Sequence, residues 1–358
     1  MKTVNGHLEI HDKGFGFLRS IDDNFEPVPD DVFVPTGLIQ QFGLLEGSFI
    51  SGTGAEGDGR NQNLRLSGID TVNGVSPEEN ADIEQLRNRV SINPNERLVM
   101  TRSSKDLMGM ALDTVVPIGK GQRGLIVSPP KSGKTTIMRH MANAIVENDP
   151  DVTVFALLVD ERPEEVTDFK RGLVGAHVLH SSADQSISRH MRITRIAVHT
   201  AIRCAEAGGD AVVFIDSLTR MSRAFNINTD SRGRTMSGGL GVNALAVPRK
   251  IFGAARNVEG GGSLTIIATI LVETGSRMDD IIYQEFKGTG NMDLVLSRKC
   301  AEQRVFPSIN INASGTRKEA LLFDDAQYQK ALEIRRGLSD LDEVKAMSEF
   351  LEYLDRNS

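Results

Sequence analysis

Residues 124–136 read GLIVSPPKSGKTT. This stretch has the pattern of an apolar strand, a loop and a Gly-Lys-Thr sequence that opens a helix, the order typical of a phosphate-binding loop. Loop N–H groups and the helix N-terminus point at phosphate oxygens. The usual first glycine is replaced by Ser128. The predicted nucleotide-binding residues are Pro130, Lys131, Ser132, Gly133, Lys134, Thr135 and Thr136.

Each residue type suits ATP with Mg²⁺, the two predicted cofactors. Gly133 permits a close backbone approach, Lys134 neutralises the β- and γ-phosphates, and the Thr135 hydroxyl ligates Mg²⁺. The seven histidines form no metal-ligand cluster in the sequence, so no other metal is expected.

Two further apolar runs end in carboxylates. Residues 211–215 lead into Asp216, where an aspartate that holds Mg²⁺ is expected, although a helix N-cap is an alternative for this residue. Residues 154–159 lead into Asp160, Glu161 and Arg162. Parallel strands bring their C-terminal ends to one sheet edge, so Glu161 is predicted to orient the water that attacks the γ-phosphate.

Strand and helix signals alternate after residue 101. Continuous apolar runs at 152–159, 211–215 and 264–272 are typical of strands buried on both faces, and residues 134–147 have helical spacing. This pattern predicts an α/β domain with a mostly parallel sheet over residues 102–358. Residues 74–101 are predicted to be a linker with a helix at 78–90.

The first part of the chain predicts a small all-β domain over residues 1–73. Short strand-like runs at 7–10, 16–19, 32–34 and 48–52 are separated by turn residues, and residues 56–59 favour a tight hairpin. Close spacing of short strands indicates a barrel. Five Lys/Arg against eleven Asp/Glu give this part a net charge of −6, while the whole chain carries −7.

Composition indicates a cytoplasmic protein that does not enter the membrane. The hydrophobic share of 39% and the charged share of 25% are ordinary for a globular chain. The N-terminus is polar, and the longest apolar runs fall short of the ~20 residues that a membrane span needs. Two distant cysteines show no metal-ligand spacing.

Five further segments follow one another along the chain: GFGFLRS at 14–20, DERPEEVT at 160–167, DSLTR at 216–220, FKGTGNM at 286–292 and SGTRKE at 314–319. Together they resemble the bacterial transcription termination factor Rho family. The resemblance implies a RecA-like ATPase core after a cold-shock-like OB fold. It also implies a ring of six subunits and an RNA-dependent ATPase and 5′-to-3′ helicase. Such a protein binds single-stranded, pyrimidine-rich RNA and releases it from the RNA polymerase elongation complex.

The resemblance also implies roles for individual residues. The catalytic set is Lys134, Glu161, Asp216, Arg304 and Arg317, with Arg317 as an arginine finger from the neighbouring subunit; Arg162 joins the nucleotide site and Phe306 packs on adenine. The RNA-binding set is Phe15, Phe17, Arg19 and Phe33 in the barrel, with Arg232, Arg234, Lys287, Gly288, Thr289 and Gly290 in two loops facing the pore. From the residues alone, the three barrel phenylalanines could equally fill a small core.

Two alternative functions remain open at this stage. One is a RecA-like hexameric ATPase of the rotary or protein-secretion type, which would hydrolyse ATP without RNA. The other is an RNA-binding protein without turnover. Retention of Lys134, Glu161, Asp216 and Arg317 argues against the second alternative.

Overall fold

The computed structural model describes residues 2–56, 63–228, 239–241 and 243–357. The first domain is a closed five-stranded barrel in the order β1-β2-β3-β5-β4, the small OB-type fold expected from the sequence. Its elements are β1 (Lys2–Ile10), β2 (Gly16–Arg19), β3 (Val32–Val34), α1 (Thr36–Gln41), β4 (Phe49–Glu56) and β5 (Leu64–Val72). Alternate residues such as Val4, Leu8 and Leu18 fill its core. The hairpin predicted at 56–59 lies mostly outside the described residues.

The helix that follows the barrel is shorter than the sequence predicted. A capping box between Ser76 and Glu79 starts α2 (Pro77–Asp82), but the chain becomes extended at Ile83. The prediction of a helix through residue 90 was therefore wrong beyond Asp82. The physical reason is tertiary: Leu86 is buried in the core of the second domain, and its N–H donates to Glu206 Oε1 at 2.7 Å.

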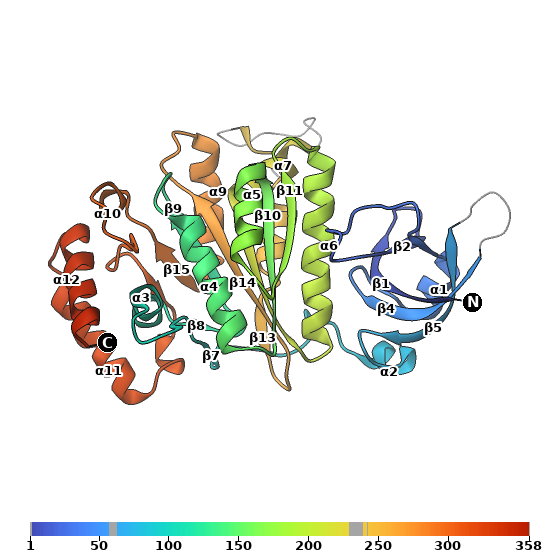
Figure 1. Ribbon diagram of the computed structural model, residues 1–358, viewed down its shortest axis with the longest axis horizontal. Coiled ribbons are helices and arrows are strands. Elements are labelled where there is room, and N and C mark those ends of the chain that lie inside the picture. The colour runs from blue at the N-terminus through green and yellow to red at the C-terminus, as the bar shows by residue number, and fades with distance from the viewer. Residues whose placement is uncertain (1, 57–62, 229–238, 242, 358) are drawn as a thin grey trace.

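The second domain is built on a nine-stranded, mostly parallel sheet whose main path is β11-β10-β12-β14-β9-β15-β16 (Figure 1). Its strands are β6 (Ser91–Ile92), β9 (Arg123–Ser128), β10 (Val152–Glu161), β11 (His177–Ser182), β12 (Asp210–Asp216), β13 (Arg256–Val258), β14 (Ser263–Leu271), β15 (Met292–Val295) and β16 (Gly315–Thr316). A separate pair joins β7 (Arg97–Leu98) to β8 (Ile118–Gly119). The helices are α3 (Leu107–Val115), α4 (Lys134–Asn148), α5 (Pro163–Gly172), α6 (Ile187–Glu206), α7 (Leu218–Asn228), α8 (Ala246–Phe252), α9 (Arg277–Lys287), α10 (Arg298–Glu302), α11 (Asp325–Leu338) and α12 (Glu343–Arg356), with a 3-10 turn η2 (Glu319–Leu321).

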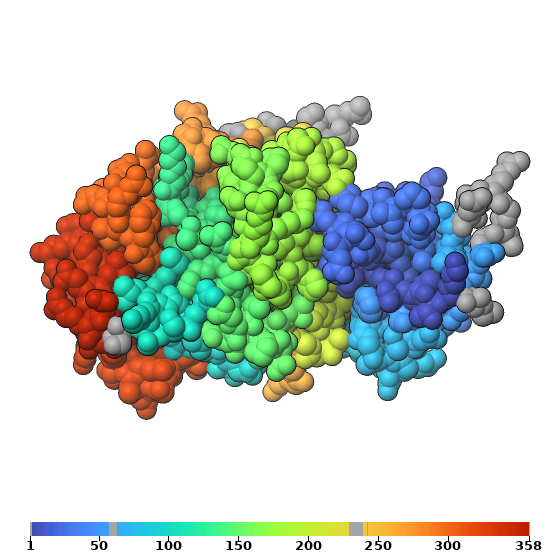
Figure 2. All heavy atoms as spheres, in the orientation of Figure 1, coloured from blue at the N-terminus to red at the C-terminus, as the bar shows by residue number. Residues whose placement is uncertain are grey.

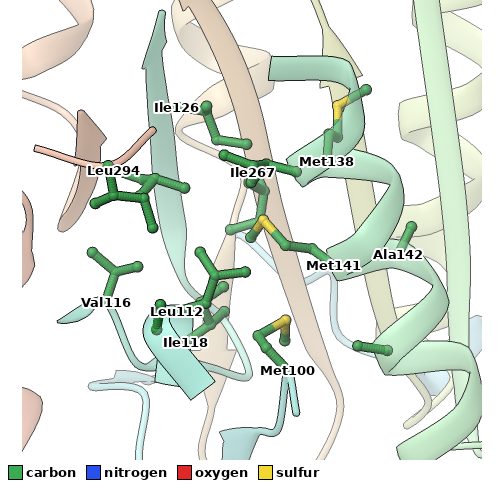
Figure 3. Packing of buried hydrophobic residues seen from close by; sticks show 14 of the residues in the cluster. Met100, Leu112, Val116, Ile118, Ile126, Met138, Met141, Ala142, Ile267 and Leu294 are labelled. Carbon is green, nitrogen blue, oxygen red and sulfur yellow. The ribbon is translucent and has the colours of Figure 1, made fainter. Parts of the chain in front are cut away.

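Strand β9 shows why the apolar runs do not alternate with polar residues. Ile126 faces the cluster that contains α4, whereas Leu125 and Val127 face the cluster that contains α6. Figure 3 shows Met138 and Met141 of α4 packed toward Ile126, Ile267 and Leu294. Both faces of the sheet are buried, as the sequence predicted. None of the described helices is long and apolar enough to cross a membrane.

The barrel docks against α6 and the edge strand β11. Figure 2 shows its blue atoms abutting the yellow-green atoms of α6. Phe25 is fully buried in the α6-side core. The Asn24 side chain donates to His180 O at 2.9 Å and accepts from His180 N–H at 2.8 Å, which covers part of the exposed edge of β11. Arg192 of α6 binds Glu9 of β1, with Nε 2.5 Å from Oε1.

Candidate nucleotide and RNA sites

The phosphate loop follows β9 and leads into α4. Gly133 occupies the N-cap of α4 with φ 84°, a left-handed conformation that glycine adopts without strain. The substituted Ser128 is buried, and its hydroxyl lies 2.9 Å from Ser132 Oγ, which donates to Pro129 O. Ser308 Oγ donates to Ser132 O at 2.5 Å. Hydrogen bonds within the loop and one from Ser308 fix its conformation, and the Ser128 hydroxyl is part of this network. Ser128 is therefore accommodated in place of glycine.

Three of the five predicted catalytic side chains, Lys134, Glu161 and Asp216, meet at the C-terminal ends of β9, β10 and β12. Lys134 Nζ lies 2.6 Å from Asp216 Oδ2 and 3.6 Å from Glu161 Oε2. Asp216 Oδ1 accepts from Thr269 Oγ1 at 2.7 Å. Arg220, which the sequence reasoning did not single out, places Nη1 3.2 Å from Glu161 Oε1. Its signal was present in the DSLTR segment, one turn after Asp216.

Burial controls the charges in this cluster. Desolvation raises the pKa of Glu161, and Asp216 reinforces the shift against the opposing effects of Lys134 and Arg220. Burial alone would lower the pKa of Lys134, but the carboxylates of Asp216 and Glu161 outweigh it and raise that pKa. Oε2 of Glu161 is buried without a hydrogen-bond partner among the described atoms. An acceptor of this kind suits a water molecule beside the terminal phosphate.

The alternative reading of Asp216 as a helix N-cap is not favoured by the contacts. Both its side-chain oxygens are engaged, one by Lys134 and the other by Thr269. It is Ser217 whose hydroxyl accepts from a backbone N–H of α7, that of Arg220, at 3.2 Å. The Asp216 carboxylate is therefore directed to the phosphate loop.

The donor set fits Mg²⁺ with ATP. The Thr135 hydroxyl lies 3.4 Å from Lys134 Nζ and thus beside the Asp216 carboxylate. Mg²⁺ is commonly held by one or two protein oxygens, substrate phosphates and waters. Across the part of the chain that is described, no group of three or more His, Cys, Asp or Glu side chains could hold a metal by itself.

Phe306 lies beside the phosphate loop, whereas Arg162 directly follows Glu161 and starts α5. The Phe306 ring is 47% exposed, and a Cβ atom placed on Gly133 would lie 3.9 Å from its Cε1 atom. This position suits packing on adenine. Arg162 is the N-cap residue of α5, with Nη1 3.6 Å from Glu165 Oε1 and a side chain that is 66% exposed. Arg304 is also exposed, in the turn that precedes Phe306.

Arg317 lies far from the phosphate loop of its own chain. Its N–H donates to Asn291 O at 2.9 Å, and Asn291 N–H donates to Arg123 O, at the start of β9. The phosphate loop begins after Ser128, at the other end of this strand. Six strand residues span about 20 Å. Arg317 can therefore meet a nucleotide at such a loop only if the loop belongs to another subunit.

The predicted pore loops are not placed together by the described residues. Thr289 O accepts a hydrogen bond from Arg123 Nε. The Lys287–Gly290 segment therefore lies at the start of β9, whereas the phosphate loop follows the other end of this strand. Arg232 and Arg234 lie outside the described residues. The flanking Gly239 is close to Met278 of α9, because a Cβ atom on Gly239 would lie 3.8 Å from Met278 Cε.

The three barrel phenylalanines form a partly exposed face rather than a core. The Phe15, Phe17 and Phe33 ring centroids are 5.5–5.9 Å apart, and none belongs to the buried barrel cluster. His11, which the sequence reasoning also missed, stacks on Phe15 at 4.6 Å with a 6° interplanar angle. We call these four rings the aromatic face. Unstacked bases bind to such platforms.

Arg19 packs against the Phe17 ring of the aromatic face. Its guanidinium lies 4.8 Å from the Phe17 ring centroid and is bonded to Glu9 at 2.7 Å and to Asp31. The residue is only 8% exposed. A direct RNA contact by Arg19 stays a prediction, whereas its contacts fix Phe17 and connect it to Glu9, the partner of Arg192.

This fold and this site define a RecA-like P-loop ATPase joined to an OB-type domain. Residues 109–316 match the ATP synthase alpha/beta family, nucleotide-binding domain, and residues 4–78 match the Rho termination factor, RNA-binding domain. Among solved structures, an ATPase from the type III secretion system of pathogenic bacteria is similar at TM-score 0.62 and 20% identity, covering 75% of this chain and 82% of that chain. An ATP synthase subunit, NeqB, from Nanoarcheaum equitans is similar at TM-score 0.59 and 19% identity, covering 74% and 71%.

Curated relatives show the family. Transcription termination factor Rho of Haemophilus influenzae is 47% identical over 349 residues, 97% of this chain and 83% of that protein. The same factor from Neisseria gonorrhoeae is 46% identical over 98% of this chain and 84% of its own length, and that from Escherichia coli K12 is 46% identical over 97% and 83%. The chain belongs to the transcription termination factor Rho family.

Proposed function

We propose that this protein is an ATP-driven, RNA-dependent transcription termination factor that acts as a homohexamer in the cytoplasm. It binds single-stranded, pyrimidine-rich RNA, moves along it in the 5′-to-3′ direction and releases it from the RNA polymerase elongation complex. The observation that carries the proposal is the presence, in one chain of the Rho family, of the Lys134–Glu161–Asp216 cluster and the aromatic face.

The nucleotide chemistry follows from the cluster. Mg²⁺, held by Thr135 and Asp216 together with the phosphates, would neutralise charge on the phosphate oxygens. Lys134 is placed to contribute a positive charge beside the same oxygens, and its raised pKa keeps it protonated. Glu161 presents a buried oxygen, Oε2, that accepts no hydrogen bond from the described atoms and is suited to accept a proton from the attacking water. Arg220 orients the other oxygen of Glu161.

The proposal of a ring is supported by the location of Arg317. A guanidinium stabilises the charge that develops in phosphoryl transfer only when it touches the phosphates. Because Arg317 lies beside Asn291 and Arg123, the chain's own phosphate loop is out of its reach. A ring in which Arg317 of one subunit faces the loop of the next completes each site. Arg304, two residues before Phe306, would contribute from the side of its own phosphate loop.

The decisive experiment measures ATP hydrolysis by the purified protein with and without poly-pyrimidine RNA. Lys134→Ala serves as the blank. Strong stimulation by RNA that disappears in the variant is the expected result. Hydrolysis that RNA leaves unchanged contradicts the proposal.

A second candidate is an ATPase of the rotary or protein-secretion type. The match of residues 109–316 to the ATP synthase alpha/beta family, nucleotide-binding domain, favours it. Such an enzyme would hydrolyse ATP equally well without RNA, so the same experiment separates the two functions.

A further inference from the structure

Two adjoining hollows of about 780 and 570 Å³ follow α6 and α8; the first lies between the barrel and the second domain, and the second lies between residues 85–87 and the second domain. They share His199, Val247 and Ile251, so they form one continuous depression, which we call the α8 groove. Phe17 and His11 line its first end, and Arg87 and Arg256 line its second end. The groove therefore begins at the aromatic face and leads away from it along the second domain.

The α8 groove is positively charged although the chain is acidic. Seven lysine or arginine residues and three acidic residues line it, whereas the whole chain has a net charge of −7. Four of the seven cations are held in ion pairs: Arg19 and Arg192 with Glu9, Arg203 with Glu206 at 2.8 Å, and Arg195 with Glu46 at 3.2 Å. The charge that the groove offers to a phosphate therefore comes mainly from Arg87, Lys250 and Arg256. Arg87 and Lys250 are exposed cations of the groove.

The groove wall between the cations is apolar. Val247, at the shared centre, is 45% exposed, and Ile251 lies beside it on α8. The side chain of Arg195 is 48% exposed on the facing side of α6. Alternating cations and apolar surface match the phosphates and the sugars of an extended nucleic-acid strand.

The acidic charge of the barrel favours phosphate contacts outside it. Its charge of −6 opposes a phosphate backbone, while its rings attract bases. We propose that the α8 groove binds the sugar–phosphate backbone of single-stranded RNA whose adjoining bases stack on the aromatic face. This inference rests on the proposed function, since it supposes that the barrel binds RNA. It assigns base stacking to the barrel and most of the ionic contacts to the second domain.

The test removes two groove cations from the full-length protein. The variant Arg87→Gln/Lys250→Gln is compared with Arg336→Gln/Lys105→Gln, which removes the same charge at exposed positions of α11 and of the turn before α3, remote from the barrel (Figure 1). The dissociation constant of a fluorescent oligo-pyrimidine is measured over a range of salt concentrations. Each phosphate contact on a single strand adds about 0.7 to the slope of log K against log salt.

The groove variant should lower that slope by about 1.4 and weaken binding at low salt by more than about tenfold. The matched control should keep the parent's slope. A second pair, Val247→Glu with Val174→Glu as control, places a new carboxylate either in the groove or at a 79% exposed position that does not line it. Only Val247→Glu should weaken binding.

Three outcomes overturn the inference. The first is a groove variant with the parent's slope and affinity. The second is a change in subunit assembly, seen by mass measurement, with an unchanged slope; the groove would then be a subunit interface. The third is a parent protein that binds no RNA and shows no RNA-stimulated ATP hydrolysis, which overturns the proposed function as well. If RNA stimulates ATP hydrolysis by the parent protein but the groove variant binds RNA as the parent does, only the inference about the α8 groove is overturned.

Discussion

Lys134 Nζ lies 2.6 Å from Asp216 Oδ2, which ties the phosphate loop to the end of β12. Both carboxylates that face this ammonium group, Asp216 and Glu161, are 1% exposed. Lys134→Ala therefore removes the phosphate contact and leaves two buried acids near each other. We expect ATP hydrolysis to fall at least ~10²–10³-fold, and the free energy of unfolding to fall by about 3 kcal/mol.

A double-mutant cycle separates these two effects. Asp216→Asn combined with Lys134→Ala removes both charges of the pair, so it should lose less stability than the sum of the single variants. Chemical denaturation of all four proteins, without nucleotide, gives the coupling. Additive losses would show that the pair does not stabilise the fold.

Glu161→Gln should abolish turnover while ATP binding persists. The substitution keeps the size of the side chain but removes the base, so kcat should fall by about 10²–10⁴-fold. Burial raises the pKa of Glu161, and the carboxylate must be ionised to accept a proton. The acid limb of the parent's pH–rate profile should therefore lie above pH 4.5, the ordinary glutamate pKa. A profile without this limb, or a variant with the parent's kcat, would exclude Glu161 as the base.

The core of the ATPase domain could be predicted because its strands are buried on both faces. Runs such as residues 264–272 contain too many apolar residues to be solvent-exposed in any fold. Strand β5 escaped prediction because few of its residues are buried, Leu66 and Val72 among them. It is a strand through its pairing with β4, a contact distant in sequence from any local signal.

The phosphate-loop cluster was also predictable, since parallel strands bring their C-terminal residues to one edge. Arg220, although it belongs to the DSLTR segment, and His11 were not singled out, because an arginine or histidine is usually a solvated side chain. Only the structure shows Arg220 at Glu161 and His11 stacked on Phe15. The position of the Lys287 loop was not predictable either. Its glycines and positive charge are compatible with either end of the strands, so packing decides where the loop lies.

The aromatic face should dominate RNA affinity. Phe17→Ala removes a stacking platform worth about 1–3 kcal/mol per base, so the dissociation constant should rise about 5–150-fold. Phe49→Ala is the matched control, because Phe49 is 39% exposed on the barrel but lies outside the face. Titration of fluorescent oligo-pyrimidine measures both. Equal affinity of the Phe17 variant and the parent would place RNA elsewhere.

His11 should contribute to the same face. Its ring continues the stack on Phe15, so His11→Ala should weaken RNA binding by a smaller factor, of order 1 kcal/mol or about fivefold. His11→Phe keeps a planar ring and should retain affinity. If the alanine and phenylalanine variants bind equally, His11 does not stack on a base.

The barrel–core junction should lose stability in mild acid. Burial, followed for His199 by the charges of Arg203 and Arg195, lowers the pKa of that residue to about 4. Burial also lowers the pKa of His7 to about 4, with His177 adding to the shift and the Gly47 carbonyl and Asp22 opposing it. The unfolded chain takes up these protons near pH 6.5, so stability is complete above that pH and declines as the pH falls toward 4.

Thermal unfolding from pH 7.5 to 4.5 checks this expectation. The parent's melting temperature should drop steadily below pH 6.5, and His199→Gln should reduce the drop. His11→Gln, at an exposed position, serves as the control. A melting temperature that stays constant down to pH 5 would contradict the assignment.

Phe25 should couple the barrel to the ATPase core. It is 0% exposed and packs in the cluster around α6, while the adjacent Asn24 bonds to the β11 backbone. Phe25→Ala should lower the free energy of unfolding by about 3–5 kcal/mol.

The activities of this variant are measured at a low temperature at which it remains folded. RNA binding and ATP hydrolysis without RNA should match those of the parent, because the aromatic face and the Lys134 cluster contain no atom of Phe25. Stimulation by RNA should be reduced, since the Glu9–Arg192 contact next to it would no longer be held in place. Full stimulation in a variant shown to be destabilised would mean that the signal from RNA reaches the nucleotide site without passing through this junction.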